Sequence, residues 1–252
     1  MPERVLSIMA HPDDAEFLCA GTLIRLQEKG WEIHIASMTP GDCGSMDLSR
    51  EKIAQARIEE ARAAAARIRG HYHCLGRRDL IVCYDAASIR RTVELVRRVD
   101  PAVVITHSPQ DYVPDHEMTS LLARSACFGA PVPNFQTDEL PAARATGRIP
   151  HLYYAAPIEG KDIFGEPIRF SLAIDISEVI GLKADMLACH QSQREWLRTR
   201  HGMDEYVEAM KRWSAEVGRG AGVEYAEGFR QHRGHAYPQD DVLGELLGER
   251  RD

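Results

Sequence analysis

The chain alternates short apolar runs of strand length with longer segments whose apolar residues recur at helical spacing. Residues 5–10 form a continuous apolar run, and residues 15–29 follow it at helical spacing. Residues 102–106 form a second run, rich in the β-branched residues that favour strands. The pattern predicts strands at 5–10, 31–38, 71–75, 102–106, 151–155 and 169–174, and helices at 15–29, 49–68, 86–99, from about 116, 175–190 and 203–217.

This alternation of strand and helix is typical of βαβ units, and continuous apolar strands indicate a sheet buried on both faces. The predicted fold is therefore α/β, a doubly wound three-layer sandwich with a mostly parallel, Rossmann-like sheet and a C-terminal extension. With 252 residues, the chain fits a single domain over 1–252. Within it we expect an α/β core over about 1–130, and a pocket-mouth loop, extra strands and a helical tail over about 131–252.

Charge and composition argue against some classes of binding partner. The formal net charge of −7 argues against nucleic acid or an anionic membrane as a partner. No apolar run approaches the length of a membrane span, and no secretion signal leads the chain. The six cysteines are scattered without CxxC spacing, which favours reduced thiols. The sequence therefore predicts a cytoplasmic protein that acts on a small molecule.

The first predicted strand ends at His11-Pro12-Asp13-Asp14. Pro12 ends the strand because proline has no N–H to donate. His11 and Asp14, separated by a tight turn, can converge on one divalent ion, which leaves Asp13 free to act as a base. A catalytic zinc site has three protein ligands and an open position for water. The motif therefore predicts a metal centre at the carboxyl end of the first strand, where α/β folds bind ligands.

An alternative interpretation of this motif involves no metal. Asp13 or Asp14 could cap the following helix, and His11 could be a surface residue of an ordinary βα turn. The position of the motif at the end of the first strand favours the metal centre over this alternative.

A second polar cluster follows the predicted strand at 102–106. Pro114-Asp115-His116 comes just before a predicted helix, and His116 at the helix start is well placed to be the third metal ligand. Asp115 would then orient an imidazole through a hydrogen bond. The two motifs together are a much stronger signal than either one alone.

These motifs carry a family resemblance. Residues 10–16 (Ala-His-Pro-Asp-Asp-Ala-Glu), followed by Gly-Thr-Leu at 21–23, resemble the opening signature of the LmbE-like, or PIG-L, family of zinc-dependent N-acetylglucosamine deacetylases. Thinner matches extend over most of the chain. The resemblance implies a homo-oligomer with one Zn²⁺, or another divalent ion, in each subunit. It assigns the metal to His11, Asp14 and His116, the general base to Asp13, and the sugar hydroxyls to Arg57 and Asp79.

The sequence departs from the family at Val113. Relatives commonly have a histidine there, which is thought to stabilise the tetrahedral intermediate or protonate the leaving amine. Valine can do neither. His232 and His235, in a glycine-flanked tail segment, are the predicted catalytic replacements, from the same chain or from a neighbouring subunit. His107 is a further candidate, and the competing interpretation makes both tail histidines exposed polar residues of a terminal hairpin.

The predicted function is that of a zinc-dependent hydrolase. It would remove the acetyl group from an N-acetylated amino sugar, or from its glycoside or conjugate, with metal-activated water. Two alternatives stay open: a metal-dependent amidase that cleaves a non-sugar or thiol-conjugate acyl amide, and a non-catalytic sugar-binding protein that retains the metal. The presence of Asp13 argues against the binding protein, which has no need of a base beside the metal.

Overall fold

The structure is a computed structural model that describes residues 2–194 and 205–248. The described residues form one seven-stranded sheet in the order β3-β2-β1-β4-β5-β7-β6. Strands β1 to β5 are mutually parallel, and β7 runs antiparallel to both of its neighbours. The strands are β1 (Arg4–Met9), β2 (Glu32–Ser37), β3 (His71–Cys74), β4 (Val103–Thr106), β5 (His151–Ala155), β6 (Leu172–Asp175) and β7 (Ala226–Gln231).

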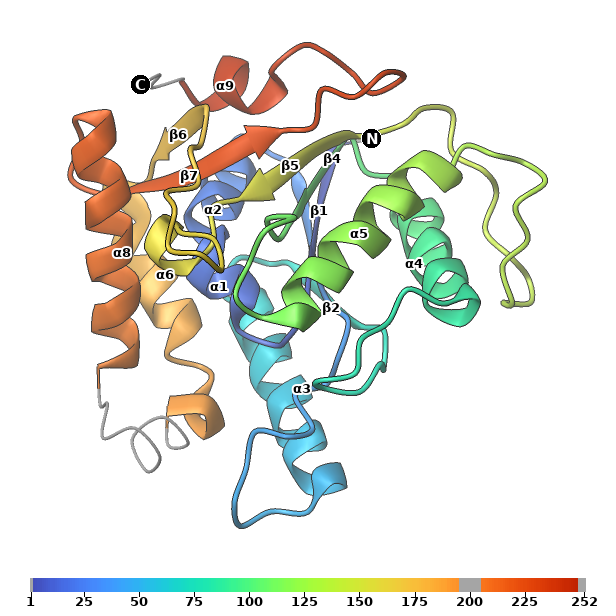
Figure 1. The fold of residues 1–252 in the computed structure, drawn as a ribbon, viewed down its shortest axis with the longest axis horizontal. Coiled ribbons are helices and arrows are strands. Elements are labelled where there is room, and N and C mark those ends of the chain that lie inside the picture. Colours follow the sequence, from blue (N-terminus) through green and yellow to red (C-terminus); the bar gives the residue numbers. More distant parts are fainter. Residues whose placement is uncertain (1, 195–204, 249–252) are drawn as a thin grey trace.

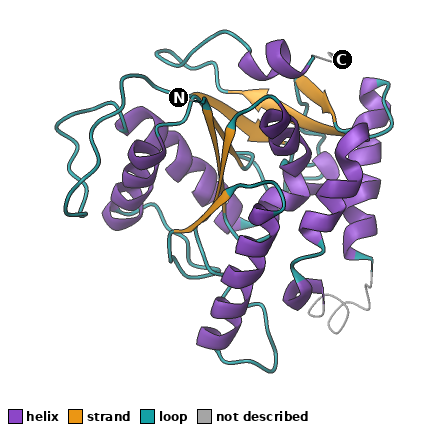
Figure 2. Ribbon diagram, turned by 180° about the vertical axis from the view of Figure 1, so that it is seen from behind, coloured by secondary structure: helices purple, strands orange, loops and turns teal. Residues whose placement is uncertain are grey.

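Helices cover both faces of this sheet (Figures 1 and 2). One face packs against α4 (Ala86–Val99) and α5 (Pro114–Gly129). The other packs against a larger group of helices and a larger hydrophobic core. That group comprises α1 (Asp14–Leu18), α2 (Ala20–Glu28), α3 (Arg50–Ala66), α6 (Ile180–Leu187), α8 (Tyr206–Ala221) and α9 (Val242–Leu247). The predicted α/β sandwich with a mostly parallel sheet is therefore confirmed.

Some local expectations differ from the structure. The helix predicted at 15–29 is two helices, because the backbone of Cys19 leaves the helical region (φ −145°) between α1 and α2. The helix predicted from residue 175 begins with a 3₁₀ turn (Ser177–Val179) before α6. The tail segment that the competing interpretation placed in a terminal hairpin contains β7, which lies inside the sheet between β5 and β6. The predicted start of a helix at Met203 lies outside the described residues.

The sheet order places the candidate site. The chain runs outward from β1 to β2 and β3, and then returns to the other side of β1 with β4. The loops after β1 and β4 therefore diverge at a topological switch point, which is where open α/β sheets bind ligands. His11 follows β1 and His107 follows β4, so the fold brings the two predicted polar clusters to one crevice.

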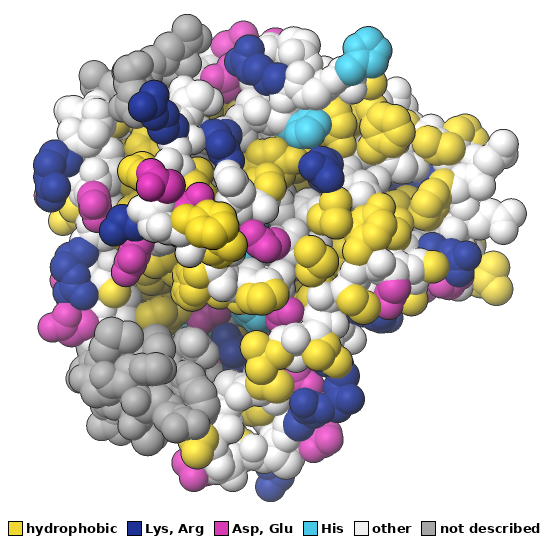
Figure 3. Space-filling view, in the orientation of Figure 1, with side chains coloured by type: hydrophobic (Ala, Val, Ile, Leu, Met, Phe, Trp, Pro, Cys, Tyr) yellow, Lys and Arg dark blue, Asp and Glu magenta, His cyan; other side chains and the backbone are white. Residues whose placement is uncertain are grey.

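The surface carries charges of both signs. On the face shown in Figure 3, dark blue basic side chains are dispersed among magenta acidic ones, and hydrophobic side chains gather toward the right. Within the part of the chain that the structure describes, no helix has the length and apolar character needed to cross a membrane.

Candidate metal centre

The loop after β1 brings His11 and Asp14 together. Asp14 Oδ2 accepts a hydrogen bond from the backbone N–H of His11 (2.7 Å) and lies 3.3 Å from His11 Nδ1. Between them, Asp13 has a left-handed backbone (φ 102°), which is uncommon for a residue other than glycine. The Asp13 side chain bonds Arg57 and Tyr206, in agreement with the prediction that it stays separate from the His11–Asp14 pair.

His116 reaches the same point from the first turn of α5. Its Nε2 lies 3.6 Å from Asp14 Oδ2, and its Nδ1 lies 3.1 Å from Asp111 Oδ2. One ligand atom from each of His11, Asp14 and His116 can be chosen so that all three lie within 4.8 Å of one another. The structure therefore brings together the three residues predicted to hold a metal.

His107 and Asp111 form a second, overlapping group with His116. The His107 ring stacks on that of His116, with centroids 3.9 Å apart and planes 8° from parallel. Its Nε2 accepts a hydrogen bond from the backbone N–H of Ala10 (3.0 Å), so this lone pair is already used. Burial lowers the pKa of His107 to about 4 and keeps the ring neutral. We therefore assign the ligand role to His11 and a supporting role to His107.

The donor set fits a divalent ion. Two imidazole nitrogens and one carboxylate oxygen form a ligand set found in catalytic zinc sites. Each imidazole also has a carboxylate at its other ring nitrogen: Asp111 at His116, and Asp115 at His11 (3.3 Å). Such outer carboxylates fix the orientation of metal-bound histidines. Asp115 itself accepts backbone hydrogen bonds from Leu80 and Val82, which anchor it.

The electrostatics of the group favour a positive charge at its centre. Burial opposes ionisation of Asp14, but the three imidazoles around it outweigh burial and hold its pKa well below the usual range. Burial also opposes charge on His11, yet Asp14 and Asp115 raise its pKa to about 10. Three carboxylates thus surround the imidazoles, an excess of negative charge that a bound cation would balance.

Asp13 is held by two donors that come from distant parts of the chain. Arg57 Nη2 donates to Asp13 Oδ1 (3.2 Å) and to the carbonyl oxygen of Pro12 (2.8 Å). The hydroxyl of Tyr206 donates to Asp13 Oδ2 (2.5 Å). Burial raises the pKa of Asp13, and Arg57 opposes that rise. Tyr206 was missed in the sequence analysis, because nothing in the helical pattern of α8 distinguishes it.

Arg57, which the family resemblance assigns to the sugar hydroxyls, does not lie on the exposed face of α3. Its side chain is buried, and it reaches through a backbone gap left by two glycines. A Cβ on Gly41 or Gly44 would lie within 2.7 Å of the Arg57 side chain, so larger residues would displace the guanidinium. The glycine-rich loop after β2 therefore borders the crevice.

Asp79 lies beside this loop with one oxygen available. Its Oδ2 accepts a hydrogen bond from the backbone N–H of Cys43 (2.9 Å), while Oδ1 is buried and has no partner among the described residues. A buried acceptor without a donor is costly, so a ligand hydroxyl is an appropriate partner. Asp42, Cys43 and Asp79 also form an acidic group of metal-binding size. Both oxygens of Asp42 are already used, Oδ1 by the backbone N–H of Asp79 (2.9 Å) and Oδ2 by Arg50 (3.1 Å), which disfavours a cation there.

The tail histidines lie away from the metal centre of their own chain. Because β7 is antiparallel to β5, its last residues lie at the amino end of the parallel strands, and the metal centre lies at the carboxyl end. His232 donates its backbone N–H to Leu152, and its ring packs against Tyr154 and Tyr237. His235 is exposed. The prediction that His232 or His235 completes the site within one chain is therefore wrong, and a role in another subunit stays a prediction.

A cavity of about 390 Å³ adjoins the metal centre. The Tyr112 ring lines it and meets His116 edge to face, with centroids 6.4 Å apart. The rest of the lining comes from the segment after β5: Ile158, Glu159, Lys161, Asp162 and Gly165.

The loop expected at the pocket mouth lies elsewhere. Thr137 and Ala143 instead bond the buried carboxylate of Glu94 in α4, which holds this loop against the helix. Beyond this correction, the division of the chain into a core and a C-terminal part stays a prediction.

Comparison with known proteins agrees with this geometry. Residues 6–127 match the family described as GlcNAc-PI de-N-acetylase (PIG-L). The diacetylchitobiose deacetylase of Thermococcus kodakarensis is 29% identical over 198 residues, which cover 76% of this chain and 70% of that protein. The 4-oxalmesaconate hydratase of Pseudomonas putida is 26% identical over 238 residues, covering 90% of this chain and 88% of that protein.

A solved structure shows the same fold. The N,N'-diacetylchitobiose deacetylase from Pyrococcus horikoshii matches with a TM-score of 0.78 at 24% identity, covering 95% of this chain and 88% of that one. The similarity includes the sheet and the helices on both of its sides, and therefore the scaffold that places the crevice.

Proposed function

We propose that the protein is a zinc-dependent hydrolase that removes the acetyl group from an N-acetylated amino sugar. The chain carries a PIG-L (LmbE-like) family domain, and this family match is the starting point of the proposal. The predicted family and enzyme class, a metal-dependent N-deacetylase, are confirmed by the family match and by relatives named as deacetylases. One observation supports zinc and the acetylated amino sugar in particular. The side chains of His11, Asp14 and His116 converge, and the buried Asp13 beside them accepts two side-chain hydrogen bonds.

His11, Asp14 and His116 would hold the ion, and Asp111 and Asp115 would keep the two imidazoles in place. When bound there, a divalent ion lowers the pKa of water and polarises the acyl carbonyl. We assign one Zn²⁺ to this crevice in each chain, because the ligand set is the mixed nitrogen and oxygen set of catalytic zinc.

Asp13 supplies the acid–base chemistry. Its carboxylate takes the proton of the attacking water, and the same proton then passes to the leaving amine, so that acetate and a free amine result. Arg57 and Tyr206 hold the two carboxylate oxygens, which fixes the direction from which Asp13 can accept the proton. Fixed orientation of this kind contributes directly to rate.

Arg57 and Asp79 would recognise the sugar. Asp79 Oδ1 is a buried acceptor that a hydroxyl can satisfy, and the Arg57 guanidinium has Nε without a partner among the described residues. Such groups are suited to a polyol. The remainder of a glycoside or conjugate would occupy the cavity lined by Tyr112. We further propose a cytoplasmic homo-oligomer, in which His232 or His235 can act on a neighbouring subunit.

The experiment is acetate release from N-acetylglucosamine and di-N-acetylchitobiose by the zinc-loaded protein. Asp13→Asn keeps the shape of the side chain but removes the base, and should lower turnover by about two to four orders of magnitude. Dialysis against a chelator should abolish turnover, and added Zn²⁺ should restore it. The matched control is Asp138→Asn, which changes an exposed carboxylate paired with Arg90 and away from the metal centre. Full turnover by Asp13→Asn would overturn the proposal.

A metal-dependent hydratase is the second candidate. The relative named as a hydratase matches a larger share of both chains than the deacetylase does, and Val113 removes an imidazole that deacetylation uses. Absence of acetate release, with hydration of 4-oxalmesaconate, the substrate in the name of that relative, would favour this function. A protein that binds zinc and amino sugars but converts neither kind of substrate would be the sugar-binding alternative. Cleavage of a non-sugar acyl amide would identify the amidase.

A further inference from the structure

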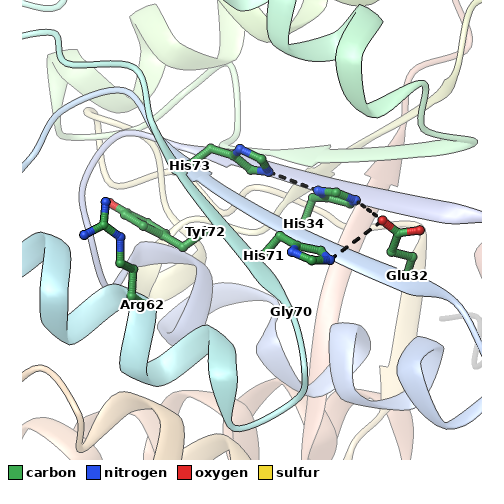
Figure 4. A pocket seen from close by; sticks show the side chains of 7 residues that line it. All are labelled: Glu32, His34, Arg62, Gly70, His71, Tyr72 and His73. Atoms are coloured by element: carbon green, nitrogen blue, oxygen red, sulfur yellow. Dashed lines mark hydrogen bonds and ion pairs between the residues drawn. The ribbon is translucent and has the colours of Figure 1, made fainter.

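A second group of potential metal ligands lies at the edge of the sheet, away from the crevice (Figure 4). His34 of β2 pairs in register with His71 of β3, and His73 follows two residues later. Glu32 lies two residues before His34. Because side chains alternate along a strand, these four side chains project from the same face of the sheet. They border a cavity of about 430 Å³ that also contacts Arg62 and Tyr72.

The four side chains already contact one another. Glu32 Oε1 lies 3.0 Å from His34 Nε2 and 3.8 Å from His71 Nε2. His34 Nδ1 lies 3.0 Å from His73 Nε2. Two ligands that share a tetrahedral ion at about 2.0–2.1 Å from each are separated by about 3.3 Å. The Glu32–His34 contact is close to this value. The ligand atoms of Glu32, His34 and His71 do not all lie within 4.8 Å of one another, so the His71 side chain has to turn toward the ion.

We propose that Glu32, His34 and His71 bind a second divalent transition-metal ion, with His73 as the hydrogen-bond partner that orients His34. Imidazole and carboxylate ligands suit Zn²⁺, Ni²⁺ or Cu²⁺. His34 is buried and fixed, whereas the His71 side chain is 59% exposed and can turn toward the ion. The fourth position faces solvent, which provides a path of entry.

The imidazoles of His34 and His73 can rearrange their protons to admit the ion without releasing a proton. In the absence of an ion, His73 donates from Nε2 to His34, and His34 donates from Nε2 to Glu32. Ion binding at His34 Nε2 moves its proton to Nδ1, which donates to His73 Nε2, and the His73 proton moves to Nδ1. Two protons are present before and after. Metal-bound histidines commonly donate a hydrogen bond from their other ring nitrogen, as His34 Nδ1 would to His73.

The contacts leave one atom of His34 and one of Glu32 directed at the same point. His34 Nε2 faces Glu32 Oε1 (3.0 Å), and the other ring nitrogen of His34 is held by His73 (3.0 Å). Arg4 contacts the other oxygen of Glu32 (Oε2, 3.3 Å), which leaves Oε1 for the ion. In Figure 4, Arg62 and Tyr72 lie on the far side of β3 from the imidazoles. Binding would tie the edge strand β3 to β2.

The test counts Zn²⁺ ions per chain by equilibrium dialysis of the full-length protein. We expect two ions for the wild type, and one for the Glu32→Gln/His71→Ala variant, which retains the ion in the crevice. Asp14→Ala should also bind one ion, and the combination of all three substitutions should bind none. Arg62→Ala, which changes the same cavity without removing a ligand, should bind two. His73→Gln should lower the affinity for the second ion by about ten- to a hundredfold.

Two results would overturn the proposal: a wild type that binds a single ion lost in Asp14→Ala, or a Glu32→Gln/His71→Ala variant that binds as many ions as the wild type. Neither result bears on the deacetylase proposal, because the edge group shares no residue with the crevice. Melting temperature gives an independent measurement. With Asp14→Ala as the background, Ni²⁺ should raise it, and the added Glu32→Gln and His71→Ala substitutions should abolish that rise.

Discussion

The hydroxyl of Tyr206 donates a hydrogen bond to Asp13 Oδ2 across a separation of 193 positions, at 2.5 Å. It connects the start of α8 to the loop after β1, and Arg57 holds the other oxygen of the same carboxylate. The C-terminal part of the chain therefore takes part in the crevice through a tyrosine, and not through the histidines that follow β7.

Tyr206→Phe should lower kcat by about one to two orders of magnitude, because a hydrogen bond to a charged group contributes about 1.5–3 kcal/mol. KM for di-N-acetylchitobiose should change little, since Tyr206 orients the base and the sugar contacts remain. Steady-state kinetics measures both. Tyr84→Phe is the matched control, because its hydroxyl bonds Ser125 away from the crevice. An unchanged kcat in a stably folded Tyr206→Phe protein would remove the positioning role.

Val113→His should raise kcat by at least about tenfold. A single donor to a developing oxyanion contributes about two to three orders of magnitude, and Val113 lies three residues before the metal-ligand candidate His116. Val113→Ala shortens the side chain without supplying a donor, so it should show no such gain. Equal rates for the two variants would indicate that another group already fills this role.

Lys183→Met should reduce the free energy of unfolding by about 3–5 kcal/mol. Lys183 and Glu227 form a buried ion pair at 2.7 Å, and Glu227 also accepts hydrogen bonds from Gly21 and Thr22 at the start of α2. Removal of the ammonium group leaves a buried carboxylate without its counter-ion. Urea denaturation measures the change.

The control for this prediction is Lys211→Met, which breaks an ion pair with Glu208 at the surface. Surface pairs contribute about 0–1 kcal/mol, so this variant should differ little from the wild type. Similar losses in the two variants would contradict the assignment of Lys183 and Glu227 as a structural pair.

Acid should destabilise the protein in part through His73. Burial and the neighbouring His34 lower the pKa of His73 from 6.5 to about 4, so the unfolded chain binds a proton that the folded chain does not bind between these values. Stability therefore falls as pH falls from about 6.5 to about 4. In the presence of a chelator, the wild type should lose more stability than His73→Gln over this window. Parallel losses, measured by urea denaturation, would exclude His73 as a contributor.

Local sequence determined most of the elements and the metal-ligand candidates. The apolar run before His11 predicted β1 because a parallel strand buried on both faces must be apolar along its whole length. The helix predicted at 86–99 agrees with α4, whose start Asp85 caps. The His-Pro-Asp-Asp and Pro-Asp-His motifs follow strands that the fold places side by side, so the convergence of His11, Asp14 and His116 could be predicted from βαβ topology.

Tertiary structure decided everything that depends on contacts between distant segments. Arg57 has the sequence environment of a solvated helix, and only the packing of α3 against the glycine-rich loop directs it to Asp13. The insertion of β7 between β5 and β6 carries His232 to the opposite end of the sheet from the metal centre. Tyr206 contacts Asp13 only because the fold packs the start of α8 against the loop after β1. The hydrophobic periodicity of a helix or strand indicates which of its sides is buried. Which segment packs against that side depends on the fold of the whole chain.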